Sequence, residues 1–223
     1  MPANLSHSKA SLSASATELA PWRSQLARAL HRNRAVPFRK FLQLATVRPD
    51  STPSNRTVVF RGFLESSNQL MFISDRRSEK IDQLQQNPNA EACWYFTKTR
   101  EQFRLSGLLT VVMAQSANST FSQARQQLWQ RISDSARLQF AWPQPKAIRT
   151  DASDTDASEA DDSETSASEF EPPAPDAQTP LPTFCLLLLD PSIVDYLSLR
   201  GEPQEREIYQ RQGDQWLSDR VNP

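Results

Sequence analysis

The sequence has few of the residues that make up the commonest ligand-binding motifs. It contains four glycines, two cysteines and two histidines in 223 residues. The glycines form no loop of the kind that cradles a nucleotide phosphate. His7 and His31 have no partners at the spacing of metal ligands, so no metal site is expected. Cys93 and Cys185 lie in apolar strand patterns, which favours two buried thiols in a cytoplasmic protein over a disulfide.

Long hydrophobic runs are also absent. The longest, Phe184 to Leu189, fits one buried strand and is far shorter than the ~20 apolar residues that span a bilayer. Residues 1–20 are rich in Ser and Ala, too polar for a secretory signal and too poor in arginine for a transit peptide. We therefore expect a disordered N-terminal tail on a cytoplasmic protein that has no membrane segment.

One segment of the chain lacks positive charge. Between Asp151 and Pro182 there are ten acidic residues and no Lys or Arg, which leaves 25 basic against 16 acidic residues elsewhere, a net charge of +9. A segment of Asp, Ser, Ala, Thr and Pro buries too little apolar surface to offset the cost of ordering, so a disordered insertion is predicted over about 150–182. The basic remainder favours anionic partners, which include phosphate cofactors, nucleic acid and this acidic segment.

Short strands and a few helices are predicted for the rest of the chain. Apolar residues at helical spacing predict helices over 21–33, 78–87, 117–132 and 134–140. Alternating or apolar runs between turn residues predict strands over 41–47, 56–63, 69–74, 91–97, 102–113, 184–189, 193–199, 205–210 and 215–221. This pattern is typical of an α+β, mainly antiparallel β domain or a small barrel. We expect residues 21–223 to form a single domain, interrupted by the insertion.

Residues suited to binding phosphate lie on predicted strands and turns. They occur in the stretches 56–63, 72–80 and 100–107. Arginine offers a planar fork, lysine a point charge, and hydroxyl groups offer neutral donors. Arg56 and Arg61 are five residues apart on one predicted strand, so we expect them to face opposite sides of the sheet. Ser78 is expected to be the N-cap of the helix that contains Lys80.

In their order and spacing, these motifs resemble those of the pyridoxamine 5'-phosphate oxidase-like FMN-binding proteins. The resemblance covers about 22–113 and resumes from 186 to 223. It depends on Arg56-Thr57-Val58-Val59 with Arg61, Ser78 to Lys80, Gln102 with Arg104, and the carboxyl end from Asp195-Tyr196 through Arg206 to Trp216. It implies a split β-barrel with peripheral helices, and a homodimer that binds FMN between its subunits.

The resemblance also implies the site residues. The implied cofactor-binding residues are Arg56, Thr57, Val58, Val59, Ser74, Ser78, Lys80, Gln102 and Arg206. Arg56 and Lys80 hold the FMN phosphate, which suits two charges near a helix N-terminus. Gln102 contacts the flavin ring, and Arg206 lies near its pyrimidine edge, where positive charge stabilises the reduced flavin. Arg61 keeps the charge of the family's lysine for substrate phosphate. No residue is predicted as a general acid or base, so the catalytic residues are unassigned.

The chain departs from the family's pattern mainly on the substrate side. Glu79 replaces an arginine, Ile73 a tyrosine and Leu197 a tryptophan, and Glu202-Pro203-Gln204 replaces an Arg-Leu-His group. A loose alignment places Trp129, Ser133 and Arg137 where the oxidase binds substrate phosphate. Because a site that lacks its polar partners loses affinity, we expect little or no oxidation of pyridoxine 5'-phosphate. The prediction is an FMN-dependent oxidoreductase with an unidentified small-molecule substrate.

Other functions remain open. One is authentic pyridoxine/pyridoxamine 5'-phosphate oxidase in vitamin B6 salvage, and another is a non-enzymatic flavin-binding module. F420 and haem, which related split barrels bind, are alternatives to FMN. Trp94, Tyr95 and Phe96 near basic residues resemble a stacking platform for single-stranded nucleic acid. They lie within one predicted strand, so packing is the favoured interpretation and no nucleic-acid partner is expected.

Overall fold

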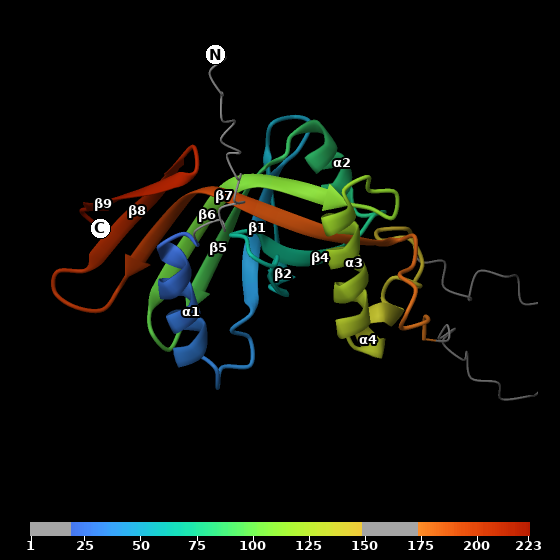
Figure 1. The fold of residues 1–223 in the computed structure, drawn as a ribbon, viewed down its shortest axis with the longest axis horizontal. Coiled ribbons are helices and arrows are strands. Elements are labelled where there is room, and N and C mark those ends of the chain that lie inside the picture. Colours follow the sequence, from blue (N-terminus) through green and yellow to red (C-terminus); the bar gives the residue numbers. More distant parts are fainter. Residues whose placement is uncertain (1–18, 149–173) are drawn as a thin grey trace, which may run out of the picture.

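The computed structural model describes residues 19–148 and 174–223 (Figure 1). Its elements are α1 (Trp22–Arg32), β1 (Phe41–Val47), β2 (Pro53–Val59), β3 (Gly62–Phe63), β4 (Leu70–Asp75), α2 (Glu79–Gln86), β5 (Asn89–Phe96), β6 (Glu101–Val112), α3 (Ser119–Arg131), α4 (Asp134–Leu138), β7 (Phe184–Ser198), β8 (Glu205–Gln212) and β9 (Gln215–Val221). The strands pair antiparallel throughout. The predicted α+β, mainly antiparallel class is therefore confirmed.

The nine strands of the described residues form one sheet. Their order is β2-β1-β5-β6-β7-β4-β3, with β8 paired to β7 and β9 to β8. β2 and β3 are the two ends of this path, and only Phe60 and Arg61 separate them in the chain. The N–H of Phe60 donates to the Lys40 carbonyl (2.8 Å) and that of Arg61 to the Met71 carbonyl (2.9 Å). One dipeptide thus joins both edges of the sheet.

Alternation along the strands separates an apolar inner face from a polar outer face. On β6, Phe103 and Leu105 are buried, whereas Gln102 and Arg104, which alternate with them, are half-buried and lie on the opposite face. Burial of the inner side chains stabilises the barrel by about 25 cal/mol for each Å² of apolar surface removed from water. The outer face keeps polar groups available for other contacts.

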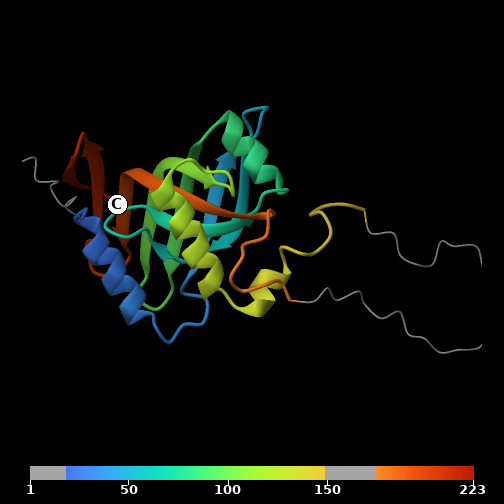
Figure 2. The same ribbon diagram turned by 45° about the vertical axis from the view of Figure 1, so that its right-hand side comes forward.

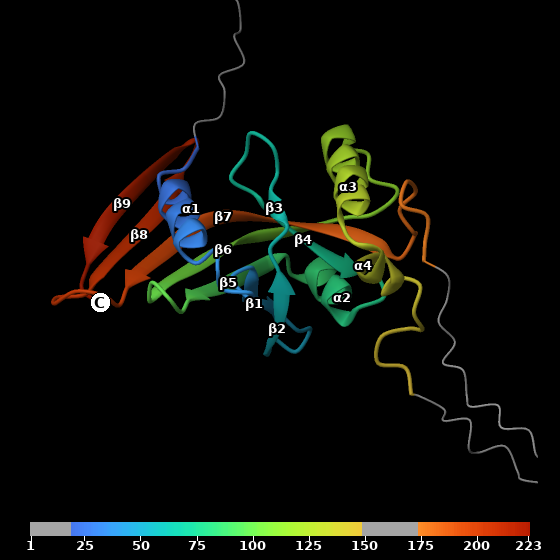
Figure 3. The ribbon, with the colours of Figure 1, turned by 90° about the horizontal axis from the view of Figure 1, so that it is seen from below.

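The helices pack at the two ends of the barrel. α1 lies beside β8 and β9, where the rings of Trp22 and Trp216 are 5.9 Å apart (Figures 1 and 3). α1 and α3 lie on one side of β6 and β7, and α2 on the other (Figures 2 and 3). Under α3, the rings of Trp129, Phe140 and Phe184 form a second apolar cluster. Within the described ranges, no helix has the length and apolarity needed to cross a membrane.

Part of the predicted insertion lies along α3. Residues 174–182 are described, and two side chains of α3 donate to their backbone: Trp129 Nε1 to Asp176 O and Arg125 Nη2 to Leu181 O, both at 2.9 Å. The rest of the predicted insertion and most of the predicted N-terminal tail lie outside the described residues, in 149–173 and 1–18. Ala20, at the end of that tail, is buried.

The two strands predicted on either side of Pro191 are one strand, β7. Pro191 lies opposite Gly107, and the register shifts between Ser106 and Gly107. A β-bulge accommodates a residue that cannot donate to the ladder, which is why the proline does not end the strand. A Cβ on Gly107 would lie 2.0 Å from the Asp190 carbonyl oxygen, so the close approach of the two backbones requires glycine.

Candidate functional site

A cavity of ≈ 360 Å³ opens beside β2. It is lined by Arg56, Thr57, Val58, Val59, Arg61, Ile73, Ser74, Asp75 and Lys80, and on its other side by Gln139, Phe140, Trp142 and Pro145. Six of the nine predicted cofactor-binding residues and the predicted substrate-binding residue therefore line one cavity. The segment after α4 completes it with apolar side chains, of which Trp142 is half exposed.

The spacing of Arg56 and Arg61 predicts that they face opposite sides of the sheet, but the structure places them at one site. Both line this cavity. The prediction assumes one strand over 56–63, but β2 ends at Val59 and the chain crosses to the other edge of the sheet at Phe60 and Arg61. Because the strand is interrupted, its alternation does not continue to Arg61.

Lys80 lies in the first turn of α2 and is held by two serine hydroxyls. Its Nζ donates to Ser74 Oγ (2.9 Å) and Ser78 Oγ (2.7 Å). Ser78 is the N-cap residue, as predicted, but its side chain makes no capping hydrogen bond. Burial, and after it the positive charge of Arg56, lowers the pKa of Lys80. An ammonium has three donors, so one N–H of Lys80 remains for a ligand.

The Arg56 guanidinium is held by buried groups behind the cavity. Its Nη1 donates to Leu44 O (3.1 Å) and Thr46 Oγ1 (2.7 Å), and its Nη2 to Ser54 Oγ (2.8 Å) and Gln83 Oε1 (3.2 Å). Burial lowers the pKa of Arg56, yet an arginine side chain stays charged. The cavity thus has a positive wall whose orientation is set by the protein.

Arg61 adds a third positive charge, and no hydrogen-bond acceptor for its side chain lies among the described residues. Its Nε is buried and has no hydrogen-bond partner among the described residues, and burial lowers its pKa. A buried donor without a partner costs free energy that an anionic ligand would recover. In the described part of the chain, no carboxylate forms an ion pair with Arg56, Arg61 or Lys80.

The two carboxylates next to this site are paired with other cations. Asp75 accepts from Arg77 Nη2 at 2.6 Å, an ion pair with little solvent exposure. Glu79, which stands where the family has an arginine, accepts from Lys146 Nζ at 2.6 Å, and this hydrogen bond lowers the pKa of Glu79. Their negative charge is therefore offset, and the cavity keeps a positive field that suits a phosphate.

This donor set fits FMN at its phosphate end. Lys80 and Arg56 supply charge, and Ser74 and Ser78 supply hydroxyl groups. The first turn of α2 begins at this point without a hydrogen bond from the side chain of its N-cap residue. The side chains that hold the cations are neutral, so a bound dianion would compete with no carboxylate. The one carboxylate in the lining, Asp75, is paired with Arg77.

Gln102 and Arg206, the predicted flavin-ring residues, do not line this cavity. They lie on the outer face, with Gln102 opposite Leu197 on β7 and Leu197 opposite Arg206 on β8. Arg206 forms an ion pair with Asp195 (2.7 Å), rather than with Glu202 or Glu205, and this pairing raises the pKa of Arg206. Within one chain, the structure brings the phosphate residues together and leaves these two apart.

Two residues loosely aligned with the oxidase's substrate site are structural. Trp129 is fully buried, and its indole N–H donates to the backbone. Arg137 is buried, and its Nη1 donates to the carbonyls of Trp129 (3.0 Å) and Ile132 (2.7 Å). Neither side chain lines the cavity, whereas Arg61 does.

The sequence alone does not predict that Thr46, Ser54 and Gln83 belong to the site. Each is less than a tenth exposed and bonds to Arg56. The available signal was Gln83, a polar residue between Ile81 and Leu84 on the buried face of α2. A polar side chain in a buried stripe needs a partner, and Arg56 is that partner.

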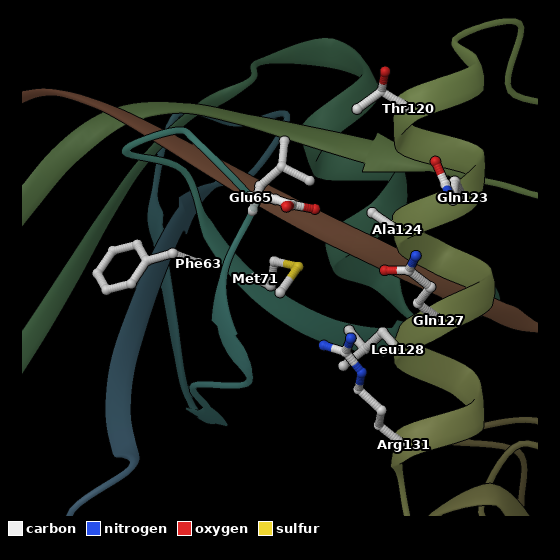
Figure 4. A pocket seen from close by; sticks show the side chains of 10 residues that line it. Phe63, Glu65, Met71, Thr120, Gln123, Ala124, Gln127, Leu128 and Arg131 are labelled. Carbon is white, nitrogen blue, oxygen red and sulfur yellow. The ribbon is translucent and has the colours of Figure 1, made fainter. Parts of the chain in front are cut away.

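A second cavity of ≈ 330 Å³ lies between α3 and the β3–β4 segment. Figure 4 shows Gln123, Gln127 and Arg131 on α3, with Glu65 and Met71 across from them. It contains none of the predicted site residues. Among the described residues, no group of three His, Cys, Asp or Glu side chains is placed to hold a metal ion.

Comparison with known proteins places the chain among FMN-binding proteins. A family model described as pyridoxamine 5'-phosphate oxidase, FMN-binding domain, matches residues 19–113. The chain is 35% identical over 212 residues to pyridoxine/pyridoxamine 5'-phosphate oxidase 2 of Arabidopsis thaliana, covering 93% of this chain and 99% of that protein.

Solved structures give the same result. A pyridoxamine 5'-phosphate oxidase-related, FMN binding protein from Nostoc punctiforme PCC 73102 superposes with a TM-score of 0.83 at 50% identity, covering 93% of this chain and 100% of that one. PhzG from Burkholderia lata 383 shares the fold, with a TM-score of 0.67 at 18% identity over 94% of this chain and 100% of that one. The predicted split-barrel fold and the predicted cofactor, FMN, are confirmed. The chain belongs to the pyridoxamine 5'-phosphate oxidase-like family of FMN-binding proteins.

Proposed function

We propose that this protein is an FMN-dependent oxidoreductase that acts on a small anionic molecule. The observation that carries the proposal is a cavity with three cations, Arg56, Arg61 and Lys80, none of which has a carboxylate partner in the described residues. Two of them belong to the phosphate site, and Arg61 is left for a second anion. The bound flavin supplies the redox chemistry, whereas Arg61 binds and orients the substrate.

We also propose that the working unit is a homodimer with the cofactor between the subunits. Gln102 and Arg206 lie on the outer face, away from the cavity of their own chain. Tyr95 and Ile193, on the same outer face, are 44% and 42% exposed. Large exposed apolar side chains beside polar ones are typical of interfaces. A second copy seated on this face would bring its Gln102 and Arg206 toward the partner's cavity.

Oxidation of pyridoxine or pyridoxamine 5'-phosphate is the second candidate. The Arabidopsis thaliana relative with this name aligns along nearly its whole length. Trp129 and Arg137 count against it, because both are buried and bonded to backbone carbonyls. A cofactor-binding module without turnover is the third candidate, since the cavity lining holds no histidine and its one carboxylate, Asp75, is paired with Arg77.

The first experiment is a visible absorption spectrum of the purified protein, with the released chromophore identified. We expect FMN, and we expect its loss from an Arg56→Ala/Lys80→Ala double variant that keeps the native melting temperature. A colourless protein that takes up no added FMN would refute the proposal. The FMN-loaded protein is then tested for hydrogen peroxide production with pyridoxine 5'-phosphate. Turnover at ~1 per second or faster would replace the first candidate by the second.

A further inference from the structure

We propose that Gln83 and Thr46, which lie behind the cavity and do not line it, are positioning residues that hold Arg56 as an oriented positive charge for the cofactor's phosphate. The inference rests on the proposed function and concerns how its phosphate site works. It predicts that residues out of reach of the ligand decide how strongly the phosphate is bound.

The geometry links two elements through one buried amide oxygen. Gln83 Oε1 accepts from Thr46 Oγ1 (2.6 Å) and from Arg56 Nη2 (3.2 Å), while Thr46 Oγ1 accepts from Arg56 Nη1 (2.7 Å). Gln83 is 4% exposed and Thr46 is 2% exposed, so water cannot easily replace either bond. Gln83 lies on α2 three residues after Lys80, so one helix carries both the lysine and the support of the arginine.

The hydrogen-bond count shows what Arg56 can offer a ligand. A guanidinium has five N–H donors, and the four on Nη1 and Nη2 all have protein acceptors. Only the Nε–H remains. Arg56 therefore acts on the phosphate mainly through its charge, and direct hydrogen bonds come from Lys80, Ser78 and the first turn of α2. A cationic side chain that the protein already fixes in position before the ligand arrives loses less conformational freedom on binding.

The test compares FMN with riboflavin, which lacks the phosphate. Gln83→Leu removes the shared acceptor and leaves an N–H of Arg56 and the O–H of Thr46 without this partner, so the guanidinium is held less firmly. We expect the Kd for FMN to rise about tenfold or more, and the Kd for riboflavin to change by less than about twofold. Gln85→Leu is the matched control, because Gln85 is exposed on the same helix, and it should change neither constant.

A second pair of variants covers the case in which Gln83→Leu does not fold. Thr46→Val keeps the shape and loses the hydroxyl, and Thr46→Ser restores the hydroxyl. We expect Thr46→Val to weaken FMN selectively and Thr46→Ser to recover most of the affinity. Equal losses for FMN and riboflavin, or no loss in variants with native melting temperature, would overturn the inference.

Inorganic phosphate separates this inference from the proposed function. We expect it to raise the melting temperature of the native protein, and to do so less in Gln83→Leu and Thr46→Val. If the native protein responds to phosphate but does not bind FMN, the proposed function fails and the phosphate comparison still decides the inference. If it responds to neither, both are refuted.

Discussion

Lys80 must be charged at a position where burial opposes charge. Burial and the neighbouring Arg56 both lower its pKa, and the hydroxyls of Ser74 and Ser78 are neutral acceptors that do not offset this. A bound phosphate would reverse the balance, because an adjacent negative charge favours the ammonium form. The pKa of this one lysine thus depends on whether the site is filled.

A pH dependence follows from this lowered pKa. We expect the affinity for FMN to fall as pH rises through the pKa of Lys80 in the free protein, which lies below the ordinary lysine value. Without ligand the sign is opposite: between that pKa and the higher value of the unfolded chain, the unfolded state binds more protons, so the free energy of unfolding rises with pH. Titration of the Kd against pH measures the first effect and chemical denaturation the second. A Lys80→Arg variant should keep a flat FMN affinity over the same range, and an equal decline there would contradict the assignment.

The sequence predicted which side chains meet in the site better than it predicted how they are held. Arg56, Ser74 and Lys80 were expected in one phosphate site because the motif places them there, and they line one cavity. Arg206 was assigned to the flavin ring by resemblance alone, and the sequence did not predict its ion pair with Asp195. Such pairings depend on strand register, and a single sequence does not contain the register.

At the scale of elements, the β6–β7 pair depends on one close backbone approach. Gly107 faces Pro191 at the bulge, and an added Cβ would meet Asp190 O at 2.0 Å. Because the nearest atoms belong to backbone, no side-chain rotation can relieve the clash. The two longest strands of the barrel would have to separate at this point.

Gly107→Ala should therefore lower the free energy of unfolding by about 3 kcal/mol. Gly213→Ala is the comparison. Gly213 has a positive φ of 60° but no atom within 4 Å of the added Cβ, so its cost is the backbone strain alone, about 1 kcal/mol. Urea denaturation of both variants measures the difference. A smaller loss for Gly107→Ala than for Gly213→Ala would show that the strands can shift.

The elements were predictable where pattern alone defines them. The buried stripes of β5 and β6 and the helix over α3 follow from alternation and helical spacing. The end of β2 at Val59 was missed, because closing the barrel, rather than local sequence, breaks that strand. Residues 174–182 were assigned to the insertion because they are polar and rich in proline. Their backbone carbonyls are acceptors for α3, a property that composition does not reveal.

At the scale of the whole molecule, we propose that the complete site is formed by two chains. The phosphate residues lie in a cavity on one part of the barrel, and Gln102 and Arg206 lie on its outer face. If a second copy completes the site, the phosphate residues can be substituted in one subunit and the outer-face residues in the other. This arrangement gives a test that no single variant provides.

An Arg56→Ala/Lys80→Ala chain and a Gln102→Ala/Arg206→Ala chain should each fail to bind FMN alone. Mixed dimers of the two have one site with all four changes and one with none. After random exchange of subunits in equal amounts, we expect about a quarter of the native FMN capacity to return, measured from flavin absorbance. Each variant refolded alone is the control. If both chains stay dimeric and mixing restores nothing, the site lies within one chain.

The dipeptide that joins the sheet's two edges has a consequence for hydrogen exchange. The Phe60 amide donates to Lys40, next to β1, and the Arg61 amide donates to Met71 on β4. Exchange of these two neighbouring protons therefore reports on the opening of two separate strand contacts. Because Arg61 also lines the cavity, an anion bound there should make the two strand contacts open together. We expect ligand to slow exchange at both amides by the same factor, as one cooperative opening replaces two independent ones. Slower exchange at the Arg61 amide alone would mean that the two strand contacts open separately even when the cavity is filled.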